Sequence, residues 1–371
     1  MMHCCFGASR AEKKEQGRNN QDLSGSLPVH LQLFTYNELR SATNNFHPSN
    51  KIGRGGFGTV YKGILRNGRQ VAIKALSAGS KQGAKEFLTE IDMISNVKHP
   101  NLVELIGCCV QGTDRILVYE YMENKSLDRA LLGSKSNAIK LDWSVRSSIC
   151  LGAAKGLAFL HEELEPHIVH RDIKASNLLL DKEFVPKIGD FGLAKLFPEN
   201  ITHISTRVAG TTGYLAPEYA IGGKLTKKAD VYSFGVLTLE LISGRANSEA
   251  SWGDNMQTCL LEQTWKLYEE GKLQELVDPE VEECLEDEVI RYAKIALFCT
   301  QAAPARRPSM TQVVTMLSKD IRLNDKELTA PGFFNSGGYS GEPSSTMKGT
   351  YTSVSQPFTS SAITITQVTP R

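Results

Sequence analysis

Short runs of β-branched and aromatic residues, separated by turn residues, dominate the first third of the chain. Residues 59–65 and 70–76 are two such runs, and the Asn-Gly dipeptide at 67–68 between them is typical of a tight hairpin turn. Residues 102–107 and 115–121 have the same character. Because these residue types favour a half-buried pleated surface, the pattern predicts a strand at each of these four places.

Apolar positions at helical spacing replace this pattern elsewhere. Residues 82–96 place apolar side chains three and four positions apart, which predicts an amphipathic helix. Residues 143–160 and 230–243 also fit helices. Near the start of the chain, Thr35 and Glu38 fit a capping box, which predicts a short helix that packs on the domain behind it.

The two ends of the chain carry few large apolar side chains. Residues 1–33 are rich in Lys, Glu, Gln, Asn, Ser and Gly, and residues 321–371 are rich in Ser, Thr, Gly and Pro. Such segments bury too little apolar surface to offset the loss of chain entropy, so we expect both to be disordered. The whole chain has 371 residues, enough for one large domain or two ordinary ones.

Composition and charge exclude several classes of protein. The formal net charge is +1, so no overall field indicates a nucleic-acid partner. The sequence has no signal-peptide core and no apolar run of the length that spans a bilayer, on the order of 18 residues or more. We therefore expect a cytoplasmic protein. The eight cysteines show no zinc-ligand spacing and are expected to be reduced thiols.

Two cysteines near the N-terminus leave two alternatives open. Cys4 and Cys5 stand beside Phe6, and acylation of both would attach the protein to the cytoplasmic face of the plasma membrane. Alternatively they are idle thiols in an unstructured segment. Residue 2 is Met and not Gly, so N-myristoylation is not predicted.

A polar stretch at residues 170–177 carries the residue types needed to move a phosphoryl group. Asp172 can accept a proton from an attacking hydroxyl, Lys174 can neutralise the transferred phosphate, and Asn177 offers an amide oxygen to a hard cation such as Mg²⁺. A predicted strand-turn-strand follows and leads to Asp190. That spacing predicts that this second carboxylate returns to the neighbourhood of Asn177.

A glycine motif precedes the first predicted hairpin. Gly53, Gly55 and Gly58 fit Gly-x-Gly-x-x-Gly, which alone is a weak signal. In a dinucleotide-binding fold such glycines open a helix, whereas here a strand follows them. The context therefore favours a backbone flap over nucleotide phosphates and argues against a nicotinamide oxidoreductase.

A lysine on the returning strand needs anionic partners. Lys74 lies between apolar neighbours, where an unpaired ammonium would be costly to bury. We expect it to bind the α- and β-phosphates of a nucleotide and one carboxylate. Glu90 is the candidate, because it lies next to the apolar stripe of the predicted helix; the alternative is a partly exposed surface acid.

Together these residues resemble the motif set of protein kinases, in which residues 170–177 form the catalytic loop and Asp190-Phe191-Gly192 begins the metal-binding segment. The sequence segments at 34–39, 117–122 and 210–214 are similar to those of plant receptor-like kinases. Because the chain shows no ectodomain and no membrane span, it resembles the receptor-like cytoplasmic kinases among them.

The resemblance implies an α+β, two-lobed protein-kinase fold. A small five-stranded antiparallel β-sheet N-lobe with one key helix, about residues 50–121, would sit on a mainly helical C-lobe, about residues 122–320. The kinase domain would cover residues 34–320, and ATP would bind between the lobes.

The resemblance also implies the ATP contacts and the metal ligands. Asn177 and Asp190 would hold Mg²⁺, with Mn²⁺ as an alternative metal. Tyr119 would lie behind the adenine, and the backbone of Glu120 and Met122 would bind the adenine edge. The full set of implied ATP-binding residues is Ile52, Gly53, Arg54, Gly55, Gly56, Phe57, Gly58, Val60, Ala72, Lys74, Tyr119, Glu120, Met122, Ser126 and Leu179.

Regulation is implied by the same likeness. Lys174 matches serine/threonine-specific kinases, and Arg171 matches kinases that are controlled by phosphorylation of the activation segment. Ser205, Thr206 and Thr211 are the candidate hydroxyls in that segment. For Thr211 the favoured alternative is a structural role, in which it orients Asp172 and Lys174.

Three further residues are expected to hold the catalytic machinery in place. Asp230 should be buried, with hydrogen bonds to the backbone of the catalytic loop, and Glu218 should pair with Arg307.

The predicted function is an ATP-dependent protein serine/threonine kinase that phosphorylates protein substrates, itself included, downstream of a receptor kinase. A scaffold that keeps the fold without the chemistry is the main alternative.

Overall fold

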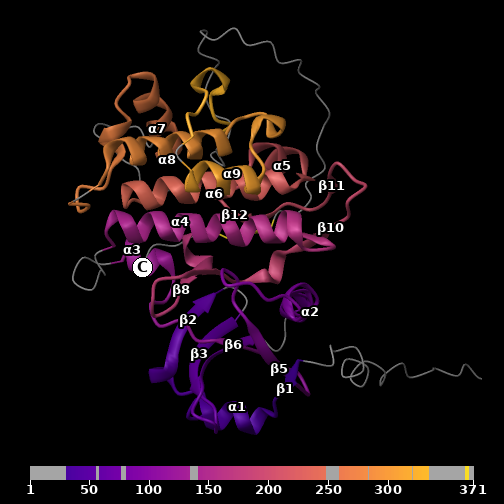
Figure 1. Ribbon diagram of the computed structural model, residues 1–371. Helices are drawn as coiled ribbons and strands as arrows, with labels where there is room; N and C mark the ends of the chain where they lie inside the picture. The colour runs from indigo at the N-terminus through magenta and orange to yellow at the C-terminus, as the bar shows by residue number, and fades with distance from the viewer. Residues whose placement is uncertain are drawn as a thin grey trace, which may run out of the picture.

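The computed structural model describes residues 31–55, 58–76, 81–133, 141–247, 259–282, 284–319, 321–333 and 364–366. Cys4, Cys5, Gly56 and Phe57 lie outside this part of the chain, as does most of the predicted C-terminal tail. Figure 1 shows a small β-sheet lobe, in indigo and violet, against a larger lobe built mainly of helices, in magenta to yellow. The predicted two-lobed α+β fold is confirmed.

The N-terminal lobe is built on a six-stranded sheet with the strand order β1-β5-β6-β4-β3-β2. The strands are β1 (Gln32–Leu33), β2 (Lys51–Gly55), β3 (Gly58–Ile64), β4 (Gln70–Leu76), β5 (Leu105–Gln111) and β6 (Asp114–Glu120). All pairings are antiparallel except that of β1 with β5. The predicted hairpin between β3 and β4 is confirmed.

The sheet differs from the prediction in two places. A sixth strand, β1, was not expected, because two residues are too few to show a period-2 pattern. Gly107 makes room for it, since a Cβ there would lie 2.1 Å from the Gln32 carbonyl oxygen. In addition, β5 begins at Leu105 and not at residue 102, because the Val103 N–H donates to Ile188 O of the other lobe at 3.0 Å.

The side chains of β4 alternate between two faces of the sheet with different surroundings. Val71 and Ile73 are fully buried and pack with Leu39 of α1 (Tyr36–Ala42). The capping box predicted for α1 is present, with the Thr35 side chain accepting from the backbone of residue 38. Because side chains alternate along a strand, Ala72 and Lys74 point to the opposite face.

One helix of the N-terminal lobe lies toward the helical lobe. Helix α2 (Lys81–Ile94) buries Phe87, Ile91 and Ile94, which confirms the predicted stripe. It packs against β6 and against the short 3₁₀ turn Phe191–Leu193 of the other lobe. This packing brings the acidic residues of α2 toward the segment that follows Asp190.

The helical lobe is centred on α6 (Lys227–Ser243), which is buried from Ala229 to Ser243 as expected of a helix that is apolar all round. Gly235 lets α8 (Glu286–Cys299) approach closely, because a Cβ there would lie 2.8 Å from the Ala296 carbonyl oxygen. The other helices are α3 (Leu127–Leu131), α4 (Trp143–Ala158), α5 (Pro217–Gly222), α7 (Leu260–Glu269), α8 (Glu286–Cys299) and α9 (Met310–Ser318).

Short strands carry the polar segments between these helices. They are β7 (His167–Val169), β8 (Leu178–Leu180), β9 (Pro186–Ile188), β10 (Lys195–Phe197), β11 (Ile204–Ser205), β12 (Ala209–Thr211), β13 (Lys224–Leu225) and β14 (Thr364–Thr366). Strands β8 and β9 form an antiparallel pair, which confirms the strand-turn-strand predicted before Asp190.

The structure describes a segment past residue 320, where the tail was expected to begin. Tyr232 of α6 donates a hydrogen bond to the Gly332 carbonyl oxygen at 2.6 Å, and the Gly332 N–H donates to Thr300 O at 3.1 Å. Residues 321–333 therefore pack on the helical lobe. Within the described residues, every helix falls short of the length and apolar character needed to cross a bilayer.

Candidate active site

Three charged side chains from distant segments meet at the junction of the two lobes. Lys74 of β4 places its Nζ 2.5 Å from Glu90 of α2 and 2.8 Å from Asp190, which follows β9. Burial acts to lower the pKa of Lys74, but the charges of Asp190 and Glu90 outweigh it and raise that pKa. Lys74 is therefore a cation, and the predicted ion pair with Glu90 is present.

The two carboxylates of this cluster differ in their surroundings. Burial raises the pKa of Glu90, and the adjacent Lys74 is the main opposing influence. The pKa of Asp190 is lowered, because Lys74 and Lys174 together outweigh the effect of burial. Glu90 also accepts a hydrogen bond from the Tyr119 hydroxyl. Asp190 is thus held ionised, and the charge on Glu90 depends on Lys74.

A second cluster surrounds the carboxylate of Asp172. Its Oδ1 accepts from the Thr211 hydroxyl at 2.6 Å, and its Oδ2 lies 2.8 Å from Lys174 Nζ. Lys174 also donates to Thr211 Oγ1 at 2.7 Å. Asn177 donates from Nδ2 to the Asp172 carbonyl oxygen at 2.8 Å and to Oδ2 at 3.0 Å. The Gly189 N–H, next in the chain to Asp190, donates to the Asn177 carbonyl oxygen at 2.9 Å, so the two clusters are neighbours.

The backbone beneath Asp172 is fixed by a buried carboxylate, as predicted. Asp230 of α6 accepts hydrogen bonds from the backbone N–H of His170 at 2.7 Å and of Arg171 at 2.8 Å. The His161 ring nitrogen Nε2 lies 2.9 Å from the same carboxylate. Burial acts to raise the pKa of Asp230, but these partners lower it overall. An ionised Asp230 therefore clamps the catalytic loop to the core of the helical lobe.

The three positions of the glycine motif differ in whether the surrounding protein atoms require glycine. A Cβ at Gly58 would lie 2.3 Å from the Ala75 carbonyl oxygen, so the β3–β4 pairing itself requires glycine there. A Cβ at Gly55 would meet nothing within 4 Å, and at Gly53 it would make only ordinary contacts with Val60. The described protein atoms thus give no steric reason for glycine at positions 53 and 55.

The residues expected around adenine come from both lobes. Val60 is paired with Lys74, and Ala72 with Tyr119, so these positions share the sheet face that carries Lys74. From the helical lobe, Leu179 of β8 forms an antiparallel bridge with Ser126.

Glu120, the last residue of β6, makes contacts with both lobes. Its side chain binds Lys187 of β9 at 2.9 Å and accepts from the Glu104 N–H at 2.8 Å. Its own N–H donates to Glu104 O at 3.2 Å, so an adenine contact from Glu120 would use its carbonyl oxygen.

Arg171 has only uncharged partners among the described residues. Its guanidinium donates to the Tyr219 hydroxyl at 2.5 Å, to Leu193 O at 3.0 Å and to Arg207 O at 2.9 Å. Burial and then the charge of Arg171 lower the pKa of Lys195 nearby. This part of the activation segment is therefore positively charged, with no described carboxylate in an ion pair with Arg171.

The three candidate phosphorylation sites differ in accessibility. Ser205 is exposed in β11, and Thr206 is half-buried with its N–H bonded to Gly223 O at 3.0 Å. Thr211 is 1% exposed, and its hydroxyl is engaged by both Asp172 and Lys174. A phosphate on Thr211 would break both bonds, so the structure favours the alternative role of Thr211 as a positioning residue.

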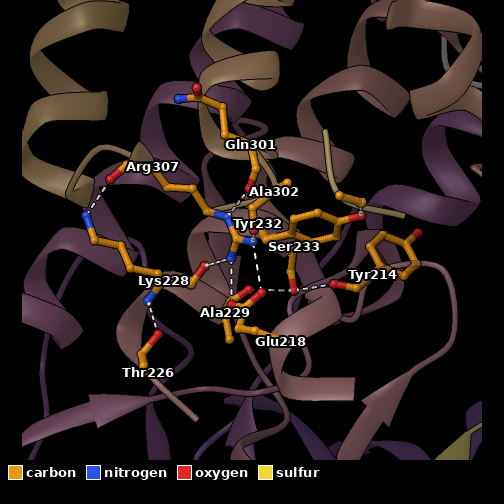
Figure 2. Close-up of polar contacts among 11 residues, drawn as sticks. Tyr214, Glu218, Thr226, Lys228, Ala229, Tyr232, Ser233, Gln301, Ala302 and Arg307 are labelled. Carbon is orange, nitrogen blue, oxygen red and sulfur yellow. Dashed lines mark hydrogen bonds and ion pairs between the residues drawn. The ribbon is translucent and has the colours of Figure 1, made fainter. Parts of the chain in front are cut away.

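The segment after Thr211 is anchored to the helical lobe by a buried arginine (Figure 2). Arg307 binds Glu218 with two hydrogen bonds of 2.7 and 2.9 Å and also donates to the carbonyl oxygens of Lys228 and Gln301. Its side chain is 0% exposed. The predicted Glu218–Arg307 pair is confirmed. Ser233 adds a hydrogen bond of 2.7 Å to the Tyr214 carbonyl oxygen, which sequence reasoning did not find.

A second acidic residue of α2 was also not predicted. Glu86 is 1% exposed; its Oε1 accepts from Gln82 at 2.8 Å, and its Oε2 has no hydrogen-bond partner among the described residues. Burial, together with the charges of Asp190 and Glu90, raises the pKa of Glu86 to about 7 despite Gln82 and Lys74. Its spacing of four from Glu90, which puts both on one helix face, was the available signal.

Comparison with known proteins gives a consistent result. The family model described as protein kinase domain matches residues 46–317. The chain is 55% identical over 323 residues to Cold-responsive protein kinase 1 of Arabidopsis thaliana, covering 86% of this chain and 83% of that protein. It is 52% identical over 349 residues to the probable LRR receptor-like serine/threonine-protein kinase At1g56140 of the same plant, covering 93% of this chain and 33% of that receptor. Against such receptors the chain therefore spans about a third of their length.

The raised pKa of Glu86 predicts a pH-dependent stability. A carboxyl whose pKa rises on folding, here from 4.5 to about 7, stabilises the fold fully below pH 4.5 and loses this contribution as the pH rises through 7. The free energy of unfolding of Glu86→Gln, taken relative to that of wild type at the same pH, should therefore rise from pH 5 to pH 8, by at most about 3 kcal/mol. Urea unfolding at both pH values measures this difference in the free energy of unfolding. Exposed Glu123→Gln is the control, and an equal difference at both pH values would contradict the assignment.

The Glu218–Arg307 pair predicts a large cost for losing the acid. Glu218→Ala leaves a guanidinium buried without its carboxylate, and we expect a loss of about 3–5 kcal/mol in the free energy of unfolding. Glu270→Ala is the matched control, because Glu270 pairs with Lys272 at 2.9 Å on the exposed surface, where solvent screens the pair and its loss should have little effect. Denaturant titration separates the two, and similar losses would contradict the prediction.

Proposed function

Because this chain belongs to the protein kinase family and is a protein serine/threonine kinase, we propose that it transfers the γ-phosphate of magnesium-bound ATP at the junction of its two lobes. The observation that carries this proposal is the simultaneous pairing of Lys74 with Glu90 and Asp190. A buried cation held by two carboxylates, next to the Asp172 cluster, matches the requirement for positioning and charge neutralisation in phosphoryl transfer.

We assign the proton transfer to Asp172. Its carboxylate is oriented by Thr211, Lys174 and Asn177, so it can accept the proton of a substrate hydroxyl without first reorganising. Lys174 is proposed to neutralise charge on the transferred phosphoryl group. These residues would work by preorganised electrostatics, since their hydrogen bonds are already formed.

We assign metal binding to Asn177 and Asp190. The Asn177 amide nitrogen is occupied by Asp172, which leaves the amide oxygen for a cation, and the pKa of Asp190 is lowered so that its carboxylate is ionised. Carboxylate and amide oxygens suit Mg²⁺, which usually completes its shell with water and substrate phosphates. When bound, the ion would neutralise charge on the phosphates. Mn²⁺ prefers similar ligands and remains an alternative.

Nucleotide recognition is proposed to use the sheet face that carries Lys74 and the facing strand β8. Gly53 and Gly55 would let the backbone approach the phosphates. Val60, Ala72 and Leu179 would contact the adenine, with Tyr119 behind it and Ser126 near the ribose. The remaining assignments, to Ile52, Arg54, Gly56, Phe57, Gly58, Glu120 and Met122, rest on the family likeness.

The cellular setting is proposed from the relatives. Those named as receptor-like kinases suggest that an upstream receptor kinase phosphorylates this chain and that it acts on proteins in a signalling pathway. Acylation of Cys4 and Cys5, with attachment to the cytoplasmic face of the plasma membrane, stays a prediction. So does the division into a kinase domain over residues 34–320 and two flanking segments.

The assigned catalytic roles predict loss of activity without loss of fold. Lys74→Met, Asp172→Asn and Asp190→Asn should each lower kcat/KM by about 10²-fold or more, because each removes a charge aimed at the reacting phosphate. The measurement is γ-phosphate incorporation into a generic protein substrate with Mg²⁺ present, alongside circular dichroism melting. Lys98→Met is the control, since Lys98 is 81% exposed. Wild-type activity in any of the three variants would overturn that residue's role.

The uncompensated charge of Arg171 predicts activation by phosphorylation. Replacing both Ser205 and Thr206 by Ala should lower activity several-fold, because a phosphate there would supply Arg171 with an anionic partner. Thr202→Ala, an exposed hydroxyl of the same segment, is the control. The double Ala change should have no further effect in an Arg171→Met background. Full activity of the Ser205→Ala, Thr206→Ala enzyme would refute the switch.

A further inference from the structure

A cleft that shares no residue with the Lys74 and Asp172 clusters lies between the activation segment and the start of α6. Its volume is about 330 Å³, near the lower end of the range for small-molecule sites, roughly 300–1,000 Å³. Phe197 of β10 and residues after it line one side, and His167 of β7 and the start of α6 line the other. The proposed phosphoryl transfer uses none of these side chains, so the cleft has no assigned occupant.

Lys227, the first residue of α6, is a half-buried cation without an acidic partner. Among the described residues it forms no ion pair, and its ammonium lies 6.0 Å from the centre of the Phe197 ring. Burial lowers the pKa of Lys227, and the charges of Glu162 and Glu199 oppose this only in part. A partly desolvated ammonium beside an open cleft is a position where an anion would be stabilised.

Two neighbouring residues at the start of α6 add hydrogen-bond donors (Figure 2). Lys228 donates from Nζ to the Arg307 carbonyl oxygen at 2.6 Å, and its backbone N–H donates to Thr226 Oγ1 at 3.2 Å. An ammonium carries three hydrogens, and a hydroxyl that accepts one bond still has its own hydrogen to donate. Lys228 and Thr226 can therefore each bind a further acceptor in the cleft that they line.

The carboxylate of Glu199 reaches this cleft without being held in it. Its Oε1 lies 3.8 Å from His167 Nε2, which is longer than a hydrogen bond, and its side chain is 62% exposed. An exposed contact of this kind contributes little, so Glu199 can turn into solvent when a stronger anion binds. Two lysines line the cleft against this single carboxylate, and the cleft is therefore net positive.

The same cleft has an apolar wall, formed by Phe197 and Ile201. Phe197 is buried, whereas Ile201 is 38% exposed. An apolar group placed against this wall would remove more of Ile201 from water, which is favourable. The lining thus combines ammonium and hydroxyl donors with an apolar surface, and this combination suits a ligand that carries an anionic group on a small apolar body.

We propose that this cleft is a binding site for a small organic phosphate monoester. Phosphate suits the site better than carboxylate, because at neutral pH it carries a charge of about −1.5 to −2 and offers three oxygens to the donors of Lys227, Lys228 and Thr226. The organic part of the ligand lies against the apolar wall. Because one side of the cleft belongs to the activation segment, the ligand holds that segment against α6.

Isothermal titration calorimetry of the full chain with phenyl phosphate tests the site. Binding should saturate at one molecule per chain and be tighter than that of inorganic phosphate, which lacks the apolar body, or of benzoate, which carries less charge. Lys227→Met should weaken binding by about tenfold or more, because it removes a charged hydrogen-bond donor. Glu199→Gln should strengthen binding about threefold, because it removes the competing carboxylate.

Two controls locate the probe. Lys195→Met should bind phenyl phosphate as wild type does, because Lys195 is another half-buried lysine of the activation segment, with a pKa lowered by burial, and lies outside the cleft. Saturating Mg·ADP should leave the affinity unchanged, since the cleft is separate from the proposed nucleotide site. Backbone hydrogen exchange at residues 197–203 should slow when phenyl phosphate is bound to wild type.

Several results would overturn the inference. They are no saturable binding at roughly millimolar phenyl phosphate, equal affinity in wild type and Lys227→Met, loss of binding in Lys195→Met, or displacement by Mg·ADP. Circular dichroism melting checks that each variant is folded. Glu199→Gln changes an exposed residue and so tests the site without disturbing the core; weaker binding in this variant would also contradict the proposal. Phosphoryl transfer is measured separately, so these results leave the kinase assignment untouched.

Discussion

The ion pair between Lys74 and two carboxylates is the interaction on which the rest of this structure depends. An ammonium on the inner face of a sheet cannot be buried alone, so β4, α2 and the segment after β9 must all approach it. That requirement sets the distance between the lobes at the point where chemistry is proposed. The Glu120–Lys187 pair adds a second link across the same junction, and the Tyr119 hydroxyl holds Glu90 in place within the N-terminal lobe.

The catalytic loop shows how a stable core supports a polar surface. Asp230 lies inside the most buried helix, and its carboxylate is satisfied by two backbone N–H groups and a histidine of the catalytic region. These three partners oppose the effect of burial and keep the pKa of Asp230 low, and the hydrogen bonds fix the direction of the chain above it. Asp172, Lys174 and Thr211 can then be held in one hydrogen-bonded cluster without burying an unpaired charge.

The activation segment is held by different kinds of contact at its two ends. Beyond Thr211 it is anchored by the Glu218–Arg307 pair and by Ser233. Before Ala209 it carries the exposed Ser205 and lies against Arg171 of the catalytic loop, whose guanidinium has only neutral partners among the described residues. A phosphate on the part before Ala209 could therefore change that part without disturbing the anchored part beyond Thr211.

Neighbouring residues in the sequence were enough to predict the capping box at Thr35, the apolar stripe of α2, the β3–β4 hairpin and the strand-turn-strand before Asp190. Each of these depends only on residues a few positions apart. The motif spacing also selected Lys74, Asp172, Asn177 and Asp190. Only the tertiary structure decided which groups are buried together: Lys74 and Asp190 are 116 positions apart. Strand β1, the orphan oxygen of Glu86 and the β12–β14 pairing were missed for the same reason. They follow from how distant segments pack, and packing leaves no periodic signal in a single sequence.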